Sequence, residues 1–349
     1  MNSKHLEIQE YYGKEVQKTA DLKTSACCST DTLPNYIKSI LKDVHSEVIA
    51  KYYGCGLTIP RVLKGLRVLD LGSGSGRDSY IISKLVGENG SVTGVDMTKE
   101  QLDVANKFID HHANVFGYKT SNVRFLQGNI EELDDLNLAP ESFDLIISNC
   151  VINLATDKQK VLSDAFKLLK TGGEMYFSDV YCDRRIPEQL KEDPILYGEC
   201  LSGAYYWNDF LIDAIKSGFS DPRSVENRPI ILENEEIANK LGDAKFYSVT
   251  YRLFKIDDLE RDCEDYGQAL KYLGTIPGKS SSFDLDDHHH FPKGKVIPVC
   301  GNTYKMLCET RFKEHFEFYG NFDTHFGIFE GCGGSMPFSS EEDSSQTCC

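Results

Sequence analysis

"VLDLGSGSGRDSY", residues 68–80, joins a short apolar run to a glycine-rich loop and to the first residues of a helical pattern. Glycines at positions 72, 74 and 76 let the backbone turn tightly. They also let a ligand approach the N-terminus of the following helix without a Cβ in the way. The spacing differs from the dinucleotide-binding G-x-G-x-x-G, although the strand, loop and helix context is the same. The stretch indicates a ligand-binding loop in an α/β fold.

A second acidic position strengthens this interpretation. Asp96 lies twenty residues beyond Gly76 and closes the next apolar run, "VTGVDM". An acceptor at this place can bind both hydroxyls of a ribose. A tight turn followed by a helix-capping Asp is the alternative explanation. The glycine loop and Asp96 together favour a nucleoside-containing ligand.

Strands and helices alternate around the loop. Apolar runs that predict strands cover residues 67–72, 91–96, 122–129, 143–149 and 172–180, with another strand at 248–256. Such alternation predicts βαβ units and a doubly wound, Rossmann-like parallel sheet. Helical spacing predicts one helix over residues 33–54 and another over 102–117, the latter preceded by a capping box formed by Thr98 and Gln101.

Composition restricts the possible partners and the compartment. The chain has 349 residues and a net charge of -16, which would repel nucleic acid and anionic membranes. No run approaches the roughly 18 apolar residues of a membrane span, and the N-terminus lacks a signal-like apolar segment. We therefore expect a cytoplasmic protein, and a monomer. Twelve cysteines in a reducing compartment favour metal, nucleophilic or redox chemistry over structural disulfides.

The glycine loop and Asp96 resemble those of the methyltransferases that use S-adenosylmethionine, over about residues 61–256. This resemblance implies that the loop holds the amino-acid end of the donor and that Asp96 holds the ribose. Residues after the third and fourth strands then flank the adenine and the methyl group. The implied donor-binding residues are Asp70, Gly72, Ser73, Gly74, Gly76, Arg77, Asp96, Met97, Asn129, Ile130 and Asn149. A nicotinamide dehydrogenase would have the same fold, but no obvious acid for hydride transfer stands out, so we regard it as the less favoured alternative.

Three cysteines are predicted at the edge of this site. Cys150 follows the fourth strand in "LIISNCVINLAT", Cys55 lies in "YYGCGL", and Cys200 lies in "YGECLSGAYYW". Converging thiols would form a site for a thiophilic centre. For Cys150 alone, burial as a small apolar residue is an equally good explanation.

Several uncommon strings in the same order resemble the arsenic(III) S-adenosylmethionine methyltransferases over about the first 255 residues. They are "ADLKTSAC", "YYGCGLTIP", "LDLGSGSGRDSY", "VTGVDMTKEQ", "SNCVINL", "YFSDVY" and "GECLSGAYYW". The resemblance implies methylation of arsenite to methyl- and dimethylarsenic species. It assigns Cys55, Cys150 and Cys200 to arsenic binding and makes Cys27 the fourth functional cysteine. It also implies a glutathione- or thioredoxin-type thiol reductant as co-substrate, and methylarsenite as a second substrate.

Two other functions stay open. A small-molecule methyltransferase of another substrate class would share the fold, but it has no use for three site thiols. A non-catalytic metalloid-binding protein would keep the thiols and tolerate the loss of Asp96.

The sequence suggests three parts. Residues 1–60 form a helical cap carrying Cys27 and Cys55, residues 61–258 form the methyltransferase core with an arsenic-binding segment at about 181–228, and residues 259–349 form a less regular C-terminal domain with a disordered, cysteine-ended tail. Cys182, Cys263, Cys300 and Cys308 are interpreted as ordinary free thiols. Cys332 and the terminal cysteine pair are candidates for arsenic scavenging or thiol exchange.

Overall fold

A computed structural model describes residues 3–12 and 33–332. The chain divides into two compact units, the first formed by residues 1–255 and 284–290 and the second by residues 256–283 and 291–349. The three-part division expected from the sequence stays a prediction. Within the described ranges, no helix is both long and apolar enough to cross a membrane.

The first unit is built on one mixed sheet with the order β3-β2-β1-β4-β5-β8-β7, and β6 pairs with β5. Strands β1 to β5 run parallel, whereas β8 is antiparallel to both β5 and β7. The predicted doubly wound sheet is confirmed. The strands are β1 (Arg67–Leu71), β2 (Ser91–Asp96), β3 (Val123–Gln127), β4 (Phe143–Asn149), β5 (Leu169–Cys182), β6 (Tyr205–Tyr206), β7 (Arg223–Ile230) and β8 (Phe246–Phe254).

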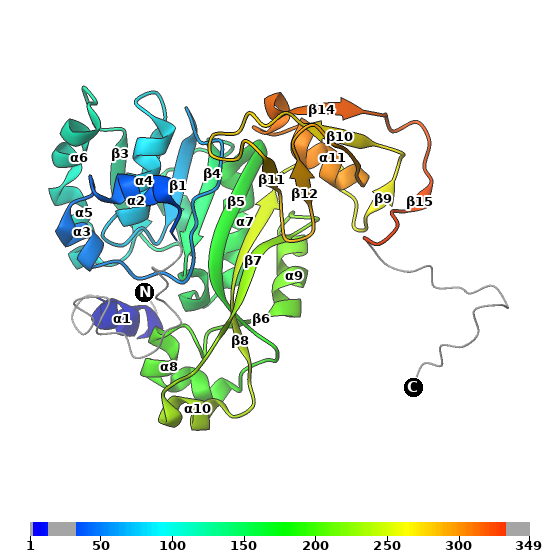
Figure 1. Cartoon of the computed structure of the whole chain (residues 1–349). Helices are drawn as coiled ribbons and strands as arrows, with labels where there is room; N and C mark the ends of the chain where they lie inside the picture. Colours follow the sequence, from blue (N-terminus) through cyan, green and yellow to red (C-terminus); the bar gives the residue numbers. More distant parts are fainter. Residues whose placement is uncertain (1–2, 13–32, 333–349) are drawn as a thin grey trace, which may run out of the picture. The chain divides into compact units, whose positions relative to one another are not determined.

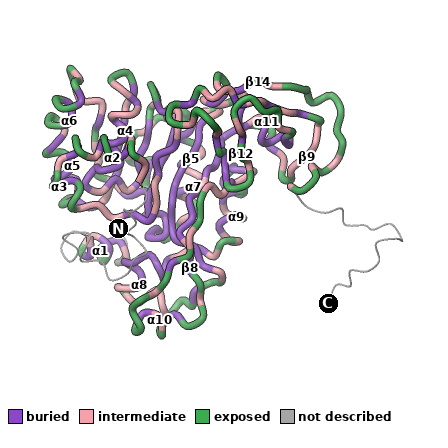
Figure 2. Tube along the Cα trace, in the orientation of Figure 1, coloured by how far each residue is buried: buried purple, intermediate pink, exposed green. Residues whose placement is uncertain are grey.

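Helices cover both faces of this sheet (Figure 1). Those in its two cores are α2 (Asn35–Leu41), α3 (Ser46–Ala50), α4 (Arg77–Val86), α5 (Lys99–Lys107), α7 (Lys158–Leu168) and α9 (Trp207–Lys216). The unit also contains α6 (Ile109–Phe116), and α1 (Ser3–Glu10), α8 (Pro194–Gly198) and α10 (Glu235–Leu241) pack in a third apolar cluster. Successive strand residues alternate between the two cores: Val68 packs with α2 and α4, and Leu69 packs with α7 and α9. Burial on both faces explains the nearly continuous apolar strands, and Figure 2 shows β5 as largely buried.

Two predicted helices are each divided in the structure. The pattern over residues 33–54 forms α2 and α3, because His45 begins a new helix by accepting a hydrogen bond from the Glu47 amide at Nδ1. The pattern over 102–117 forms α5 and α6, with the interruption at Phe108, whose ring stacks on His45 at 3.7 Å. Periodicity alone does not reveal such tertiary contacts.

The capping box predicted at Thr98 and Gln101 is wrong. Thr98 does precede α5, but its side chain makes no capping hydrogen bond. The Thr98 amide instead donates to the Asp96 carboxylate at 2.8 Å. The turn is therefore held by an acidic residue that also faces the glycine loop.

The second unit contains small sheets and one α-helix among its described residues. Strand β10 (Ala269–Tyr272) lies between β13 (Val296–Pro298) and β14 (Phe316–Tyr319), β9 (Glu264–Asp265) pairs with β15 (Gly327–Ile328), and β11 (Ser282–Asp284) pairs with β12 (His290–Pro292). The helix is α11 (Gly301–Cys308). The predicted tail falls in residues 333–349, outside the described ranges.

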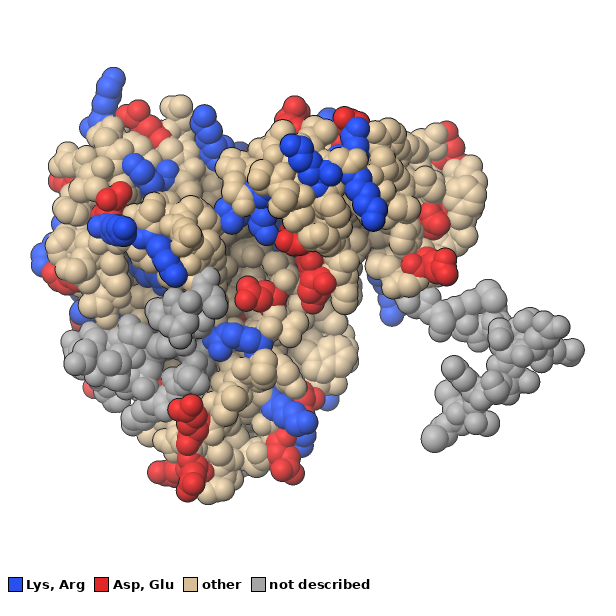
Figure 3. Space-filling view, viewed as in Figure 1, with Lys and Arg blue, Asp and Glu red and all other residues tan. Residues whose placement is uncertain are grey.

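Charged side chains of both signs are mixed on the surface. Figure 3 shows that, on the face it draws, described Lys and Arg side chains stand among Asp and Glu side chains.

Candidate functional site

The glycine loop is fixed to the end of the neighbouring strand. The Gly72 and Ser73 amides donate to the Val95 carbonyl at 2.8 and 3.0 Å. Gly72 has a φ of +73°, and a Cβ there would lie 2.3 Å from the side chain of Val151. Glycine is needed at this position both for the backbone angle and for the close approach.

A cavity opens between the glycine loop and the carboxyl ends of the strands. Most of the predicted donor-binding residues line it: Asp70, Gly72, Ser73, Gly74, Arg77, Asp96, Met97, Asn129, Ile130 and Asn149. Gly76 lies behind the loop, where it begins α4 with a φ of +88°. Cys150 also lines the cavity. The structure therefore brings one of the predicted arsenic-binding thiols to the wall of the predicted donor site.

Two carboxyl groups of the cavity, the buried Asp70 and the half-buried Asp96, have raised pKa values. Burial raises the pKa of Asp70 to about 7, with a smaller contribution from the nearby carboxylates of Asp78 and Asp96 and with an opposing hydrogen bond from Ser79. Burial also raises the pKa of Asp96, whereas the amides of Thr98 and Gly74 stabilise its charged form. Such carboxyl groups suit the binding of hydroxyl or ammonium groups that enter the cavity.

Polar atoms in the cavity wall are ready to bind a ligand. Ser73 Oγ and Gln101 Oε1 are buried, and neither has a hydrogen-bond partner among the described residues. Leaving such groups unpaired costs free energy, so they point to a polar ligand. Gly74, with no atom within 4 Å of a built Cβ, leaves open space beside them. These residues fit the polar amino-acid and ribose parts of S-adenosylmethionine.

Helix α1 closes one side of the cavity, to which it contributes His5 and Ile8. His5 Nε2 lies 2.6 Å from Glu131 Oε2, and Gln9 Nε2 donates to the Met97 carbonyl at 2.9 Å. Burial raises the pKa of Glu131, but hydrogen bonds from Thr156, the Asp157 amide and His5 outweigh it and hold the pKa below its usual range.

The residues after α1 also reach the segment that carries Cys200. Tyr11 donates to Glu199 at 2.8 Å, and Tyr12 donates to the Gly198 carbonyl at 2.7 Å. The same short stretch of chain therefore contacts both the cavity and the Cys200 segment. No local pattern in the sequence could have revealed these contacts, because the partners are more than 180 residues apart.

Asn149 links the cavity to Cys55. Its Oδ1 accepts hydrogen bonds from the Cys55 and Gly56 amides at 3.0 and 3.3 Å. The Cys55 carbonyl in turn accepts from Ser248 and Arg228. The loop that carries Cys55 is thus held at the end of β4, and Asn149 both lines the cavity and positions a thiol-bearing loop.

The three predicted arsenic-binding cysteines lie together. Cys55 and Cys150 are joined by a disulfide, with their Cα atoms 5.7 Å apart. Cys200 Sγ lies 3.5 Å from the Cys150 carbonyl oxygen. Cys150 and Cys200 have φ values of +57° and +60°, which residues other than glycine rarely adopt. Backbone strain of this kind persists where the surrounding structure imposes it, often at functional sites.

An acidic residue that the sequence analysis did not select joins these thiols. An Asp179 carboxylate oxygen and the sulfurs of Cys55 and Cys150 lie within 4.8 Å of one another. Burial raises the pKa of Asp179 to about 7, although the Val180 and Asn153 amides donate to its carboxylate. The signal in the sequence was the polar pair Ser178–Asp179 inside the apolar run of β5.

The thiol site is enclosed by apolar side chains. Cys55, Cys150 and Cys200 are at most 5% exposed. They belong to one buried cluster with Cys182 and with apolar residues that include Ile8, Leu154, Leu196, Tyr197 and Phe246. Such surroundings exclude water from the sulfurs. Cys27, the fourth predicted functional cysteine, lies outside the described residues.

Comparisons with known proteins identify the family of the chain. Residues 63–223 match the family model of a methyltransferase domain, and residues 267–337 match that of the arsenite methyltransferase C-terminal domain. An arsenite methyltransferase of Aquipseudomonas alcaligenes is 58% identical over 334 residues, 96% of each chain. That of Mus musculus is 45% identical over 317 residues, 90% of this chain and 83% of the relative.

A solved structure leads to the same assignment. The crystal structure of an arsenic(III) S-adenosylmethionine methyltransferase from Chlamydomonas reinhardtii superposes with a TM-score of 0.83 at 52% identity, covering 86% of this chain and all of that one. The chain belongs to the arsenite methyltransferase family.

Proposed function

We propose that this protein methylates arsenite to methyl- and dimethylarsenic species. The observation that carries the proposal is that Cys150, bonded to Cys55 and in contact with the Cys200 segment, lines the same cavity as the glycine loop and Asp96. Membership of the family supports it. A methyl donor in the cavity and a metalloid on the thiols would then be neighbours.

S-adenosylmethionine, when bound, supplies a methyl group on a positively charged sulfur. The glycine loop with Asp70 would bind its amino-acid end, and Asp96 would accept hydrogen bonds from its ribose hydroxyls. The wall formed by Met97, Asn129 and Ile130 would enclose the adenine. Holding both reactants in place can remove roughly 7–11 kcal/mol of the barrier.

Trivalent arsenic would bond to the thiolates of Cys55, Cys150 and Cys200 and keep its lone pair for the methyl group. No general base is required, because arsenic carries no proton that must leave. Asp179, with its pKa raised to about 7, is largely protonated at slightly acidic pH and then adds no negative charge beside the thiolates. The apolar surroundings exclude water from the reacting groups.

A thiol reductant has a defined place in this proposal. Methyl transfer makes arsenic pentavalent, and two electrons must return it to the trivalent state. As the Cys55–Cys150 disulfide forms, the two As–S bonds of these residues break; two of their four electrons form the S–S bond and two return to arsenic as its lone pair. A glutathione- or thioredoxin-type reductant would then restore both thiols by exchange. Methylarsenite as second substrate, a monomeric state and a cytoplasmic location belong to the same proposal.

The test is to incubate reduced protein with arsenite, S-adenosylmethionine and a thiol, and to separate methylated arsenic by chromatography with elemental detection. Cys150→Ser should give no product, and Cys182→Ser, a buried neighbour in the same apolar cluster, serves as the matched control. Bound arsenite without product in the unmodified protein would favour a metalloid-binding protein. Neither binding nor product would favour a methyltransferase of another substrate class.

The number of thiols needed should change between methylation rounds. Methylarsenite has one valence fewer for sulfur than arsenite, so two thiols should suffice for it. We expect Cys150 and Cys200 to serve both rounds and Cys55 and Cys27 mainly the first. Cys55→Ser should therefore still convert methylarsenite to the dimethyl product, and failure to do so would contradict this order.

A further inference from the structure

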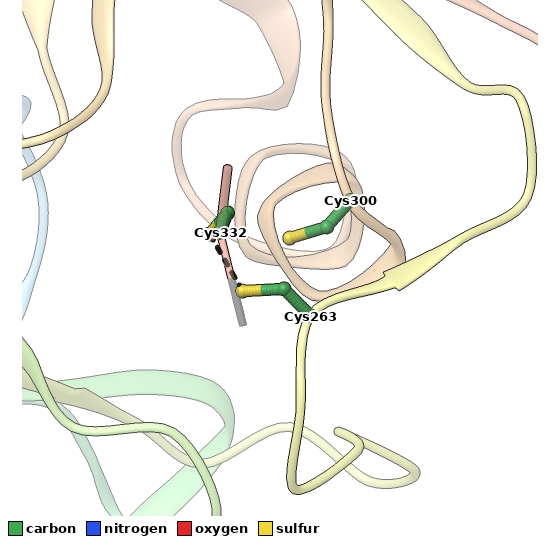
Figure 4. Close-up of side chains that lie close together, drawn as sticks. All are labelled: Cys263, Cys300 and Cys332. Atoms are coloured by element: carbon green, nitrogen blue, oxygen red, sulfur yellow. Dashed lines mark hydrogen bonds between the residues drawn. The ribbon is translucent and has the colours of Figure 1, made fainter. Parts of the chain in front are cut away.

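A second group of three cysteines lies in the second unit. The sulfurs of Cys263, Cys300 and Cys332 are all within 4.8 Å of one another (Figure 4). Those of Cys263 and Cys332 are 2.8 Å apart. From the sequence, Cys263 and Cys300 are interpreted as ordinary thiols, and only Cys332 of the three is a candidate for arsenic scavenging or thiol exchange. Along the chain, 37 residues separate Cys263 from Cys300 and 32 separate Cys300 from Cys332.

Three short segments bring these side chains together. Cys263 precedes β9, which pairs with β15, and the Cys263 carbonyl accepts a hydrogen bond from the Phe329 amide at 2.7 Å. The Cys332 amide donates to the Phe329 carbonyl at 3.2 Å. The strand pairing therefore fixes Cys263 opposite the turn that carries Cys332.

Cys300 contributes from the beginning of α11. Its Sγ accepts a hydrogen bond from the Thr303 amide at 3.5 Å and lies 3.3 Å from Thr303 Oγ1. Donors at a helix N-terminus favour negative charge on the acceptor, here the thiolate that binds soft ions. Cys308, at the opposite end of the same helix, has a different environment: burial, with Glu309 nearby, raises its pKa to about 11.

Access to this cluster differs between its members. Cys300 is buried, whereas Cys263 and Cys332 are partly exposed. An ion could therefore enter from the side of the two exposed sulfurs and be held against the buried one.

We propose that Cys263, Cys300 and Cys332 form a second binding site for trivalent arsenic, separate from the methyl-transfer site. In forming it, three thiols replace the three hydroxyl groups of arsenous acid. Each S–H proton leaves with one hydroxyl group, so three waters are released and no electron is transferred. No other His, Cys, Asp or Glu among the described residues joins the cluster. Three sulfurs complete the coordination of trivalent arsenic, whereas zinc requires a fourth ligand.

The test counts bound arsenic on the reduced full-length protein. After arsenite is added and the unbound excess is removed by gel filtration, elemental mass spectrometry should find about two arsenic atoms per chain. Cys263→Ser, Cys300→Ser and Cys332→Ser should each lose about one. Cys308→Ser, from the other end of the same helix, should lose none. X-ray absorption of Cys55→Ser, which lacks a ligand of the first site, should still show arsenic bonded to three sulfurs.

Other results would overturn the proposal. Unchanged arsenic content in all three cluster variants, with far-UV circular dichroism and melting curves showing that they fold, would mean that arsenite binds elsewhere. If zinc binds to the cluster and arsenite does not, the site belongs to a four-coordinate ion. A Cys263–Cys332 disulfide that survives treatment with thiol would exclude a three-thiol site. If Cys55→Ser loses arsenic and the three cluster variants do not, arsenic binds only at the methyl-transfer site. The proposed function and the second site can therefore be contradicted independently of each other.

Discussion

The two thiol clusters use the same side-chain chemistry in different surroundings. Cys55, Cys150 and Cys200 are buried, and Cys150 lies in the wall of a cavity that holds the glycine loop and Asp96. Cys263, Cys300 and Cys332 lie around one end of a helix, with two of the three partly exposed. In the first cluster, Cys150 and Cys200 have strained backbone conformations, and a carboxylate oxygen of Asp179 lies within 4.8 Å of the sulfurs of Cys55 and Cys150.

The difference teaches that sulfur ligands are sufficient to bind arsenic, whereas methyl transfer to arsenic also requires a neighbouring cavity for the donor. A methyl group can reach arsenic only where a donor site adjoins the thiols, as it does at Cys150. The second cluster offers ligands without the residues that we assign to the donor. We therefore expect the first cluster to control turnover and the second to control only the amount of arsenic held.

The largest expected effect is that of Cys150→Ser. Losing one arsenic ligand at the cavity wall should lower the rate of methylarsenic formation by about 100-fold or more. A displacement of about 1 Å between reacting groups can by itself lower a rate by about 100-fold. Arsenic at the second cluster should be retained. A rate within threefold of that of Cys182→Ser would remove Cys150 from the reaction and break the comparison.

The next effect concerns the donor site. Asp96→Asn removes a charged acceptor, and hydrogen bonds to charged groups contribute about 1.5–3 kcal/mol, so the KM for S-adenosylmethionine should rise about 10- to 100-fold. Arsenic content at both clusters should not change. Asp103→Asn, an exposed residue of α5 paired with Lys99, is the control. Equal KM values in the two variants would contradict the role of Asp96.

The third prediction uses the carboxylate found only at the first cluster. The folded-state pKa of Asp179 is raised to about 7, so between about pH 4 and pH 7 the folded protein holds a proton that the unfolded chain has lost. This contribution to stability therefore decreases as the pH rises through that window. Asp179→Asn cannot ionise and should lose less stability from pH 5 to pH 8, the difference amounting to about 1.4 kcal/mol for each pH unit between pH 5 and about pH 7. Urea unfolding at both pH values measures it, and parallel changes in the two proteins would argue against a raised pKa.

The smallest effect is expected for Cys300→Ser. Cys300 lies outside the methyl-transfer site, so its loss should leave kcat and the KM for arsenite within about twofold, even though the variant binds less arsenic in total. Initial rates of Cys300→Ser at saturating thiol reductant test this prediction, and Cys308→Ser serves as the control variant. A large fall in kcat would mean that the second cluster takes part in turnover.

Much of the donor site follows from local sequence. The glycine loop with Asp70 and the distant Asp96 each end a strand, and parallel strands place their carboxyl ends at one edge of a sheet. The fold class and the family were therefore predictable, and both are confirmed. The division of two predicted helices at residues 42–45 and at Phe108 was not, because it depends on contacts of His45 with residues far along the chain.

The sequence by itself determined the alternation of strands and helices, the donor loop and the presence of many thiols, since these depend on residue type and short spacing. The resemblance to a family also predicted that Cys55, Cys150 and Cys200 converge. Only the tertiary structure decided that Asp179 joins them and that Cys263, Cys300 and Cys332 meet. Cys55 and Cys150 are 95 residues apart, and Cys263 and Cys332 are 69 apart. Asp179 joins the first pair, and Cys300 joins the second. Strand order and the packing of loops bring such residues together, and neither is written in any local pattern of the chain.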